Sequence, residues 1–181
     1  MPLDPTYERV VALLEAPKVA ILQGHWTGRA RESGCQIRAP LMINGIVEPG
    51  LHLHLQCASN RPDERVSISL LVETASGKPT AFARIDWRHN DHDNVSALAG
   101  DRHLQPAGVT HIHDPRFCQD IAKLREYLGK LPAAEALDPP PGDFRQLLEQ
   151  ASVLLNIINL TEVPIPPWQL ISPLFPPAAG P

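Results

Sequence analysis

The chain is poor in lysine, in paired cysteines and in long apolar runs, and each shortage argues against a class of protein. Four lysines occur among 181 residues, and 16 Lys+Arg against 20 Asp+Glu leave a net charge of −4. This balance disfavours a basic protein that coats nucleic acid. Three cysteines with no Cys-x-x-Cys pair disfavour a disulfide scaffold or a thiolate zinc site, and they favour a reducing, cytoplasmic compartment. We expect neither a signal peptide nor a membrane-spanning segment.

Proline and histidine, with 20 and 8 copies, are the two residue types in excess. A chain of 181 residues fits one domain, or one domain with an appendage. A domain of that size buries a sufficient core without disulfides or metal. A bound metal would therefore serve function rather than folding.

Hydrophobic spacing predicts an α+β fold: an antiparallel, curved or barrel-like β-meander with an N-terminal helix, two C-terminal helices and an extended Pro-rich arm. Tyr7 to Leu14 follow a helical stripe after Asp4, which we expect to cap the helix. From Lys18 to Arg88 the period changes to two, most clearly in Leu51–Cys57. Consecutive strands joined by short turns are typical of an antiparallel meander with one apolar face.

Proline and helical spacing divide the rest of the chain. Asp114 is expected to cap a second helix, and a third follows the three consecutive prolines 139–141. The last 21 residues hold 7 of the 20 prolines and cannot form a regular helix or a central strand. We expect a single domain at 1–131, a stiff Pro-rich linker at 132–142, a helix at 143–160 and an extended arm at 161–181.

Histidine and aspartate gather in one window, residues 86–114, which holds five of eight histidines and five of ten aspartates. Imidazole and carboxylate groups are typical of metal sites and of acid–base chemistry. On a strand, His111 and His113 leave the same face about 7 Å apart at the backbone. Asp86 and His89 complete the set if their strand pairs with this one. These four residues are predicted ligands for a divalent ion such as Zn or Mn, although the fold requires no cofactor.

Plainer interpretations of the same residues stay open. A His-x-His strand often forms only an exposed polar face, and His52-Leu53-His54 repeats the motif on another strand. Asp114 suits a helix cap better than a ligand position. The run 91–94 (Asp-His-Asp-Asn) is typical of a polar loop whose side chains bond turn backbones.

Two segments together resemble a known group of sequences. Ala83-Arg84-Ile85-Asp86-Trp87 with His89, followed by Gly108-Val109-Thr110-His111-Ile112-His113, resembles uncharacterised small bacterial proteins of prophages and mobile islands. Members of this group share an Arg-x-Asp strand, a His-x-Asn/Asp turn and a Thr/Pro-His-x-His strand. The resemblance implies that the charged and imidazole side chains form one connected unit, in a setting of phage–host conflict or toxin–antitoxin pairing. That unit consists of Arg84, Asp86, His89, His111 and His113.

Two classes of function fit these features. The favoured one is a small intracellular binding or regulatory protein that contacts a protein partner or a second copy of itself, with nucleic acid less favoured. A polyproline arm loses little entropy on docking and presents large apolar side chains, although it could equally fold back on its own sheet. The residues expected to bind the partner are Pro164, Pro166, Pro167, Trp168 and Phe175.

The alternative function is a metal-dependent or histidine-based hydrolase, such as a nuclease. His111, His113 and Asp86 would hold the ion that activates water. His89 would act as acid or base, and Arg84 or Arg88 would face a phosphate. The residues expected to carry catalysis are His89, His111, His113, Asp86 and Arg84.

Overall fold

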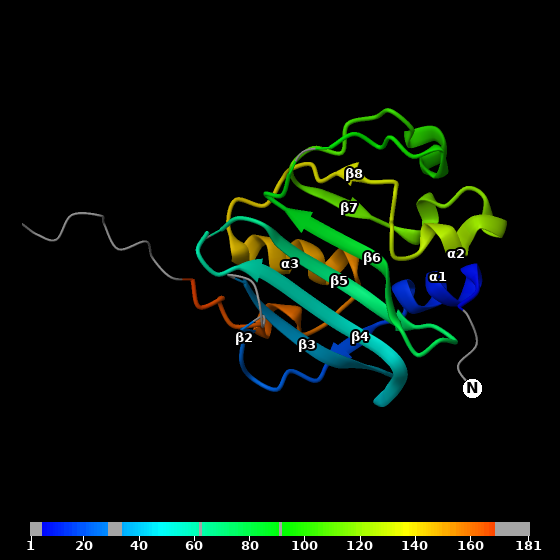
Figure 1. Ribbon diagram of the computed structural model, residues 1–181. Helices are drawn as coiled ribbons and strands as arrows, with labels where there is room; N and C mark the ends of the chain where they lie inside the picture. The colour runs from blue at the N-terminus through cyan, green and yellow to red at the C-terminus, as the bar shows by residue number, and fades with distance from the viewer. Residues whose placement is uncertain (1–4, 29–33, 62, 91, 169–181) are drawn as a thin grey trace, which may run out of the picture.

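A computed structural model describes residues 5–28, 34–61, 63–90 and 92–168 of the chain. It is an α+β protein with an eight-stranded antiparallel sheet, an N-terminal helix and C-terminal helices, which confirms the predicted fold class (Figure 1). The strands are β1 (Lys18–Ala20), β2 (Thr27–Gly28), β3 (Gly34–Ile43), β4 (Ile46–Ala58), β5 (Val66–Glu73), β6 (Pro79–Trp87), β7 (His111–His113) and β8 (Glu135–Ala136). The α-helices are α1 (Tyr7–Glu15), α2 (Leu124–Tyr127) and α3 (Phe144–Leu154).

The sheet follows the chain as a meander. Its order is β1-β3-β4-β5-β6-β7-β8, and β2 pairs with β3 outside this path. The turn between β3 and β4 consists of Asn44 and Gly45, which have φ of 52° and 76°. Positive φ at both central residues is the geometry of the hairpin turn that Asn-Gly favours. Short connections of this kind make each strand pair with its neighbour in sequence.

One face of the sheet forms the core. Ile37, Leu55, Ile68, Ile85 and Ile112 are paired across five consecutive strands and are all buried. Each fully buried side chain of this size contributes roughly 1.5–3 kcal/mol. Figure 1 shows α3 behind the sheet, on the side that these residues face. The helical residues packed in the same core are Val10, Leu13 and Leu14 of α1 and Phe144, Leu147, Leu148 and Ala151 of α3.

The opposite face of the sheet is polar along two parallel lines. Because paired residues share a face and alternate residues change face, the register places polar side chains side by side on five strands. The first polar row is Arg38, His54, Ser69, Arg84 and His113, from β3 to β7. The second polar row is Gln36, Gln56, Ser67, Asp86 and His111 on the same strands.

Lys18 fastens the end of α1 to β1. Its side chain is fully buried, and Nζ donates hydrogen bonds to the carbonyls of Leu13 (2.8 Å), Leu14 (2.7 Å) and Ala16 (2.6 Å). An ammonium group at this end of a helix satisfies carbonyls that have no partner within the helix. At the start of α1 the capping oxygen belongs to Thr6, and the expected cap Asp4 lies outside the described residues.

The helix expected after Asp114 is broken into short turns. Asp114 does cap a turn, since its Oδ1 accepts from the backbone N–H of Arg116, but this 3₁₀ turn ends at Phe117. Asp120 then caps a separate turn by accepting from Ala122 N–H. A side chain that bonds the backbone locally competes with a continuous helix. Only Leu124–Tyr127 is α-helical here.

The Pro-rich segment 132–142, expected as a linker, belongs to the fold. Its Glu135–Ala136 pair forms β8 on the edge of β7, and the carbonyl of buried Pro141 accepts a hydrogen bond from Trp87 Nε1. The backbone polar groups of an edge strand and an indole N–H thus find partners in this segment. The segment therefore supplies the last strand of the sheet instead of linking two separate bodies.

The helix expected over 143–160 is shorter than predicted. The described part of the arm that follows it packs against residues of the same chain. α3 ends at Leu154, because Asn156 takes a left-handed conformation with φ 50°. Beyond it, Pro164 O accepts from Trp26 Nε1, and Trp168 packs edge-on against Phe144 with ring centroids 5.6 Å apart. Residues 169–181, including the predicted partner-binding Phe175, lie outside the described residues.

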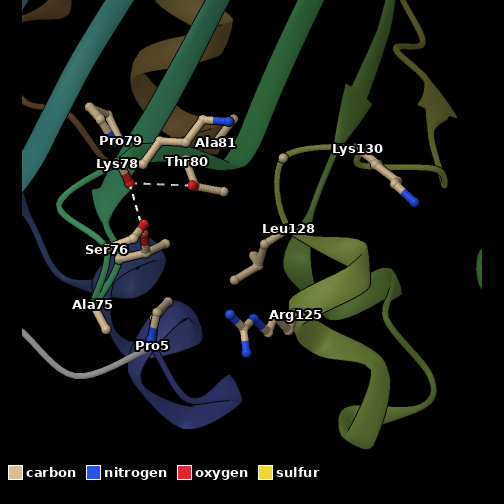
Figure 2. Close-up of a pocket in the computed structure, with 12 residues that line it drawn as sticks. Pro5, Ala75, Ser76, Lys78, Pro79, Thr80, Ala81, Arg125, Leu128 and Lys130 are labelled. Carbon is tan, nitrogen blue, oxygen red and sulfur yellow. Dashed lines mark hydrogen bonds between the residues drawn. The ribbon is translucent and has the colours of Figure 1, made fainter.

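A pocket of about 550 Å³ lies where the β5–β6 turn faces α2. Figure 2 shows Arg125 and Leu128 directed into the space between this turn and α2, with Pro5 opposite. It sits at the start of β6, whereas Asp86 is near the strand's other end. None of the helices in the described ranges is long and apolar enough to cross a membrane.

Candidate metal centre

β6 and β7 bring four of the predicted site residues together. Their antiparallel register pairs Arg84 with His113 and Asp86 with His111. The His-x-His and Arg-x-Asp motifs therefore occupy the ends of the two polar rows. The convergence predicted from the pairing of these strands is present.

His111 has one ring nitrogen bonded and the other without a hydrogen-bond partner. Nδ1 lies 2.7 Å from the carbonyl oxygen of Gly108. Because a carbonyl only accepts, Nδ1 carries the hydrogen, and in the neutral ring Nε2 then holds a lone pair. Nε2 is buried without a hydrogen-bond partner and lies 3.4 Å from Oδ2 of Asp86.

His113 is oriented in the same way. Its Nδ1 donates to the carbonyl of Ala133 at 2.9 Å, so Nε2 again has the lone pair. That nitrogen accepts from Nη2 of Arg84 at 2.9 Å and lies 3.5 Å from Oδ2 of Asp86. An Nδ1–H bonded to a backbone carbonyl is the support that metal-ligating histidines usually have.

Asp86 is the buried carboxylate of the cluster. Ser67 Oγ donates to its Oδ1 at 2.5 Å, and Arg84 Nε forms an ion pair with Oδ2 at 2.8 Å. Burial raises the pKa of Asp86, but the close ring nitrogens of His111 and His113, the charge of Arg84 and the hydrogen bond from Ser67 together bring it well below its usual range. The carboxylate is therefore ionised at neutral pH.

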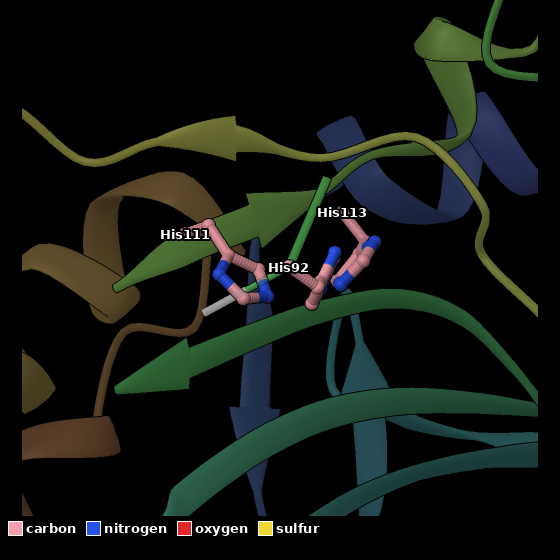
Figure 3. A group of neighbouring side chains, drawn as sticks. All are labelled: His92, His111 and His113. Atoms are coloured by element: carbon pink, nitrogen blue, oxygen red, sulfur yellow. The ribbon is translucent and has the colours of Figure 1, made fainter. Parts of the chain in front are cut away.

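A third histidine joins the cluster from the loop between β6 and β7. One ligand atom each from His92, His111 and His113 lies within 4.8 Å of the other two. The ring centroids of His92 and His111 are 4.7 Å apart, those of His111 and His113 4.9 Å, and those of His92 and His113 6.0 Å. Figure 3 shows the ring of His92 beside the two rings that leave β7. Three imidazoles on one tetrahedral Zn²⁺, at Zn–N of about 2.0–2.1 Å, have centroids about 5 Å apart.

The loop that carries His92 is held by buried polar contacts. The His92 carbonyl accepts from Ala107 N–H at 3.0 Å. Asn94 is buried, and its side chain donates to the carbonyl and accepts from the N–H of Ala134, each at 2.9 Å. These bonds hold the loop so that the exposed His92 lies next to the buried His111 and His113.

His92 was not among the ligands predicted from the sequence, and His89 was predicted in its place. His89 is half-buried, its backbone N–H bonds Val109 O at 2.8 Å, and it lies outside the group of three. Burial lowers the pKa of His89, with opposing effects of Asp86 and Arg84. The only sequence signal for His92 was its membership of the His/Asp window, since a loop has no periodicity to place it.

Two other histidines and one aspartate of the sequence hypotheses have different surroundings. His103 is exposed and outside the group of three. Asp114 caps a turn and pairs with Arg116, which agrees with its expected structural role. His54 is bonded to Gln36 and Gln56 on the polar face.

The arrangement has the chemistry of a three-imidazole metal centre with one open side. Two rings are buried and pre-oriented, the third is exposed, and a carboxylate and a guanidinium border the group. Three protein ligands leave a coordination position for water or substrate, as in catalytic zinc sites. The chain matches no protein-family model, no curated protein and no solved structure.

Proposed function

We propose that this protein is a metal-dependent hydrolase that holds a divalent ion, Zn²⁺ by preference, on His92, His111 and His113. An all-imidazole ligand set suits zinc better than magnesium or calcium, which take oxygen ligands. A zinc ion with three histidine ligands supplies a bound water whose pKa falls to about 7.

The observation that carries this proposal is the buried Nε2 of His111. Its lone pair faces the ionised carboxylate of Asp86 across 3.4 Å, and Nε2 has no hydrogen-bond partner. Two electron-rich atoms in a buried site repel each other unless a proton or a cation lies beside them. A metal ion satisfies this nitrogen together with those of His92 and His113.

The neighbouring side chains have separate proposed roles. Asp86, whose Oδ2 lies 3.4 and 3.5 Å from the two Nε2 atoms, balances the charge of the ion, while backbone carbonyls orient the rings through Nδ1. Arg84, fixed by its ion pair with Asp86, stabilises negative charge that develops on the substrate. Its hydrogen bond to Nε2 of His113 gives way to the metal, because that nitrogen has a single lone pair. His89, half-buried next to the cluster, is the residue we assign to carry protons.

Metal analysis of untagged protein tests the metal site. We expect stoichiometric Zn²⁺ after dialysis against limited zinc, and its loss in a His111→Ala/His113→Ala double variant that still folds. His103→Ala removes an exposed histidine of the same loop and should retain the metal. Wild-type protein that does not bind zinc at micromolar concentration, or equal binding by the double variant, would overturn the proposal.

A second candidate function is the protein–protein binding module predicted from the sequence. Its support is an apolar surface on and after α3, where Val153 and Ile158 are 80% and 65% exposed. A groove of about 490 Å³ adjoins it, lined in part by Leu137, Pro139 and Leu154. Exposed apolar side chains gathered in this way are typical of contact sites.

Sedimentation equilibrium tests this second function for a homo-oligomer. Val153→Asp with Ile158→Asp should shift a concentration-dependent oligomer to the monomer, and Arg145→Glu on the same helix should not. These variants are preferable to deletion of residues 163–181, because Trp168 packs on Phe144 and its removal also affects the fold. A monomeric wild type at every concentration would exclude self-association.

A further inference from the structure

The polar face continues from the histidine cluster across four more strands. The two polar rows begin at His113 and His111 and end at Arg38 and Gln36. Four strand spacings of about 4.8 Å give each row a length of roughly 19 Å. Figure 1 shows α3 on the other side of the sheet, and α1 and α2 near the end of β6 that lies away from Asp86. A ligand at the cluster can therefore extend over this face.

The composition of the rows differs from that of an ordinary solvated sheet. Their ten members are arginine, histidine, serine, glutamine and aspartate, with no lysine, no glutamate and no apolar side chain among them. Five are half-buried, four are buried and Arg38 is exposed, and several are fixed by one another. His54 bonds both Gln36, at 3.1 Å, and Gln56, also at 3.1 Å. Short planar and hydroxyl groups held in this way resemble a pre-organised polar binding surface.

The charge of the two rows favours an anion. Arg38 and Arg84 are positive, and the single carboxylate, Asp86, is already engaged by Ser67, Arg84 and the two histidines. The local balance thus opposes the −4 net charge of the whole chain.

Arg84 is the point at which such an anion meets the cluster. One N–H of Nη2 bonds His113, and Nε faces Asp86. A guanidinium has five N–H donors, so three remain for a ligand, as far as the described chain is concerned. The side chain is 29% exposed, which allows that contact. A planar guanidinium held beside a metal centre is suited to a phosphoryl group.

The rows also indicate what the rest of the ligand is. They contain no phenylalanine, tyrosine or tryptophan, which are the usual stacking platforms for the bases of single-stranded nucleic acid. Side-chain amides instead match a ligand whose remaining part carries hydroxyl groups. The half-buried Gln56 is two strands from Arg84, at roughly 10 Å.

We infer that the substrate is a small, hydroxyl-rich phosphate monoester, bound with its phosphoryl group at Arg84 and its hydroxyls over Gln56, whose amide has hydrogen-bonding capacity beyond its bond to His54. This inference rests on the proposed hydrolase function and names its substrate class. In the reaction, a water oxygen bonds to phosphorus while the ester P–O bond breaks. The water gives up a proton and the leaving oxygen gains one, so the products are an alcohol and inorganic phosphate.

Four probes distinguish the monoester inference from the hydrolase proposal on which it rests. They are glucose 6-phosphate, p-nitrophenyl phosphate, bis(p-nitrophenyl) phosphate and p-nitrophenyl acetate, each assayed with zinc-loaded full-length protein. We expect release of phosphate or nitrophenol from the two monoesters and none from the His111→Ala/His113→Ala variant. Turnover of only the acetate, or preference for the diester, would overturn the monoester inference and leave a hydrolase. No turnover of any probe by protein with bound zinc would overturn the hydrolase proposal itself.

A single substitution tests the assigned face. Gln56→Ala should raise KM for glucose 6-phosphate about tenfold, the effect of one lost hydrogen bond, with kcat unchanged. KM for p-nitrophenyl phosphate, whose body has no hydroxyls, should not change. Arg145→Ala, on α3 behind the sheet, is the control for surface substitution. Equal effects of Gln56→Ala on both substrates, or no effect on either, would exclude this face as the hydroxyl-binding site.

Discussion

The Nε2 atom of His111 lies 3.4 Å from Oδ2 of Asp86 while Nδ1 of the same ring is bonded to a backbone carbonyl. The carbonyl requires the hydrogen on Nδ1, so the two facing atoms are both electron-rich in the neutral state of the ring. A proton on His111 or a cation in the cluster resolves this conflict. The distinction can be measured, because only a metal ion also involves His92.

Asp86→Asn should weaken zinc binding by about 10–100-fold, the usual effect of changing a side chain just outside the ligand set, because it removes a negative charge beside the ion. The amide keeps the shape of the carboxylate but lacks its charge, so the variant should fold. Isothermal titration with zinc measures the affinity. Asp101→Asn, an exposed aspartate in the β6–β7 loop, provides the matched control. Unchanged affinity in Asp86→Asn would show that the carboxylate has no part in metal binding.

Asn94→Ala should loosen the loop that carries His92. The substitution leaves the N–H and carbonyl of Ala134 without their partner, which costs roughly 1–3 kcal/mol in a buried site. Urea unfolding should give that loss, and hydrogen exchange should rise in residues 92–107. Asn60→Ala, at an exposed position, should leave both measurements unchanged. An Asn94→Ala loop that exchanges as slowly as the wild-type loop would contradict this account.

Lys18 should make the protein more stable as the pH rises from 8 to 10.5. Burial lowers the pKa of Lys18 to about 8, while in the unfolded chain it keeps the usual value of 10.5. Between these values the unfolded chain binds more protons, so the free energy of unfolding increases with pH, by on the order of 3 kcal/mol over the window. The penalty for burying the charge is thus present below pH 8 and relieved above it.

Denaturant unfolding at several pH values, compared with Lys18→Met, isolates this effect. The stability of wild type relative to Lys18→Met should grow across the window. The exposed Lys78→Met variant should follow the wild-type profile throughout. A difference between wild type and Lys18→Met that is flat or shrinks with pH would show that the buried amine keeps its proton.

Phe144→Ala should destabilise the fold and release the arm at the same time. Phe144 is buried between Trp26, at 6.3 Å, and Trp168, at 5.6 Å between ring centroids. Truncation of a buried phenylalanine costs about 3–5 kcal/mol. Tryptophan fluorescence should shift to the red as Trp168 gains water. Val153→Ala, which shortens an exposed side chain on α3, should change neither stability nor emission.

Sequence reasoning located Arg84, Asp86, His111 and His113 in one site because they lie on neighbouring strands. Period-two alternation decides which face each residue occupies, and a short meander decides which strands are neighbours. Once β6 and β7 pair, the register places the four side chains on the same face, next to one another. The α+β class follows from the same two rules.

The parts that sequence reasoning missed depend on contacts between distant residues. His92 reaches the cluster because Asn94 bonds Ala134, 40 residues away. β8 is only two exposed residues long, too short for a periodic signal, and its strand pairing is supplied by β7. The helix after Asp114 breaks because Asp120 caps a second turn, an alternative that helical spacing does not reveal. The phage–host setting implied by the resemblance stays a prediction.

The first strand of the sheet gains its edge partner from a segment that is made 139 residues later. The N–H and the carbonyl of Ala20 in β1 both bond the side chain of Asn159, 139 residues later. At translation rates of about 5–20 residues per second, the ribosome needs roughly 7–28 s to make the intervening chain. During that time the β1 edge of the nascent sheet lacks this partner, so a product terminated before Asn159 would keep an edge open to aggregation.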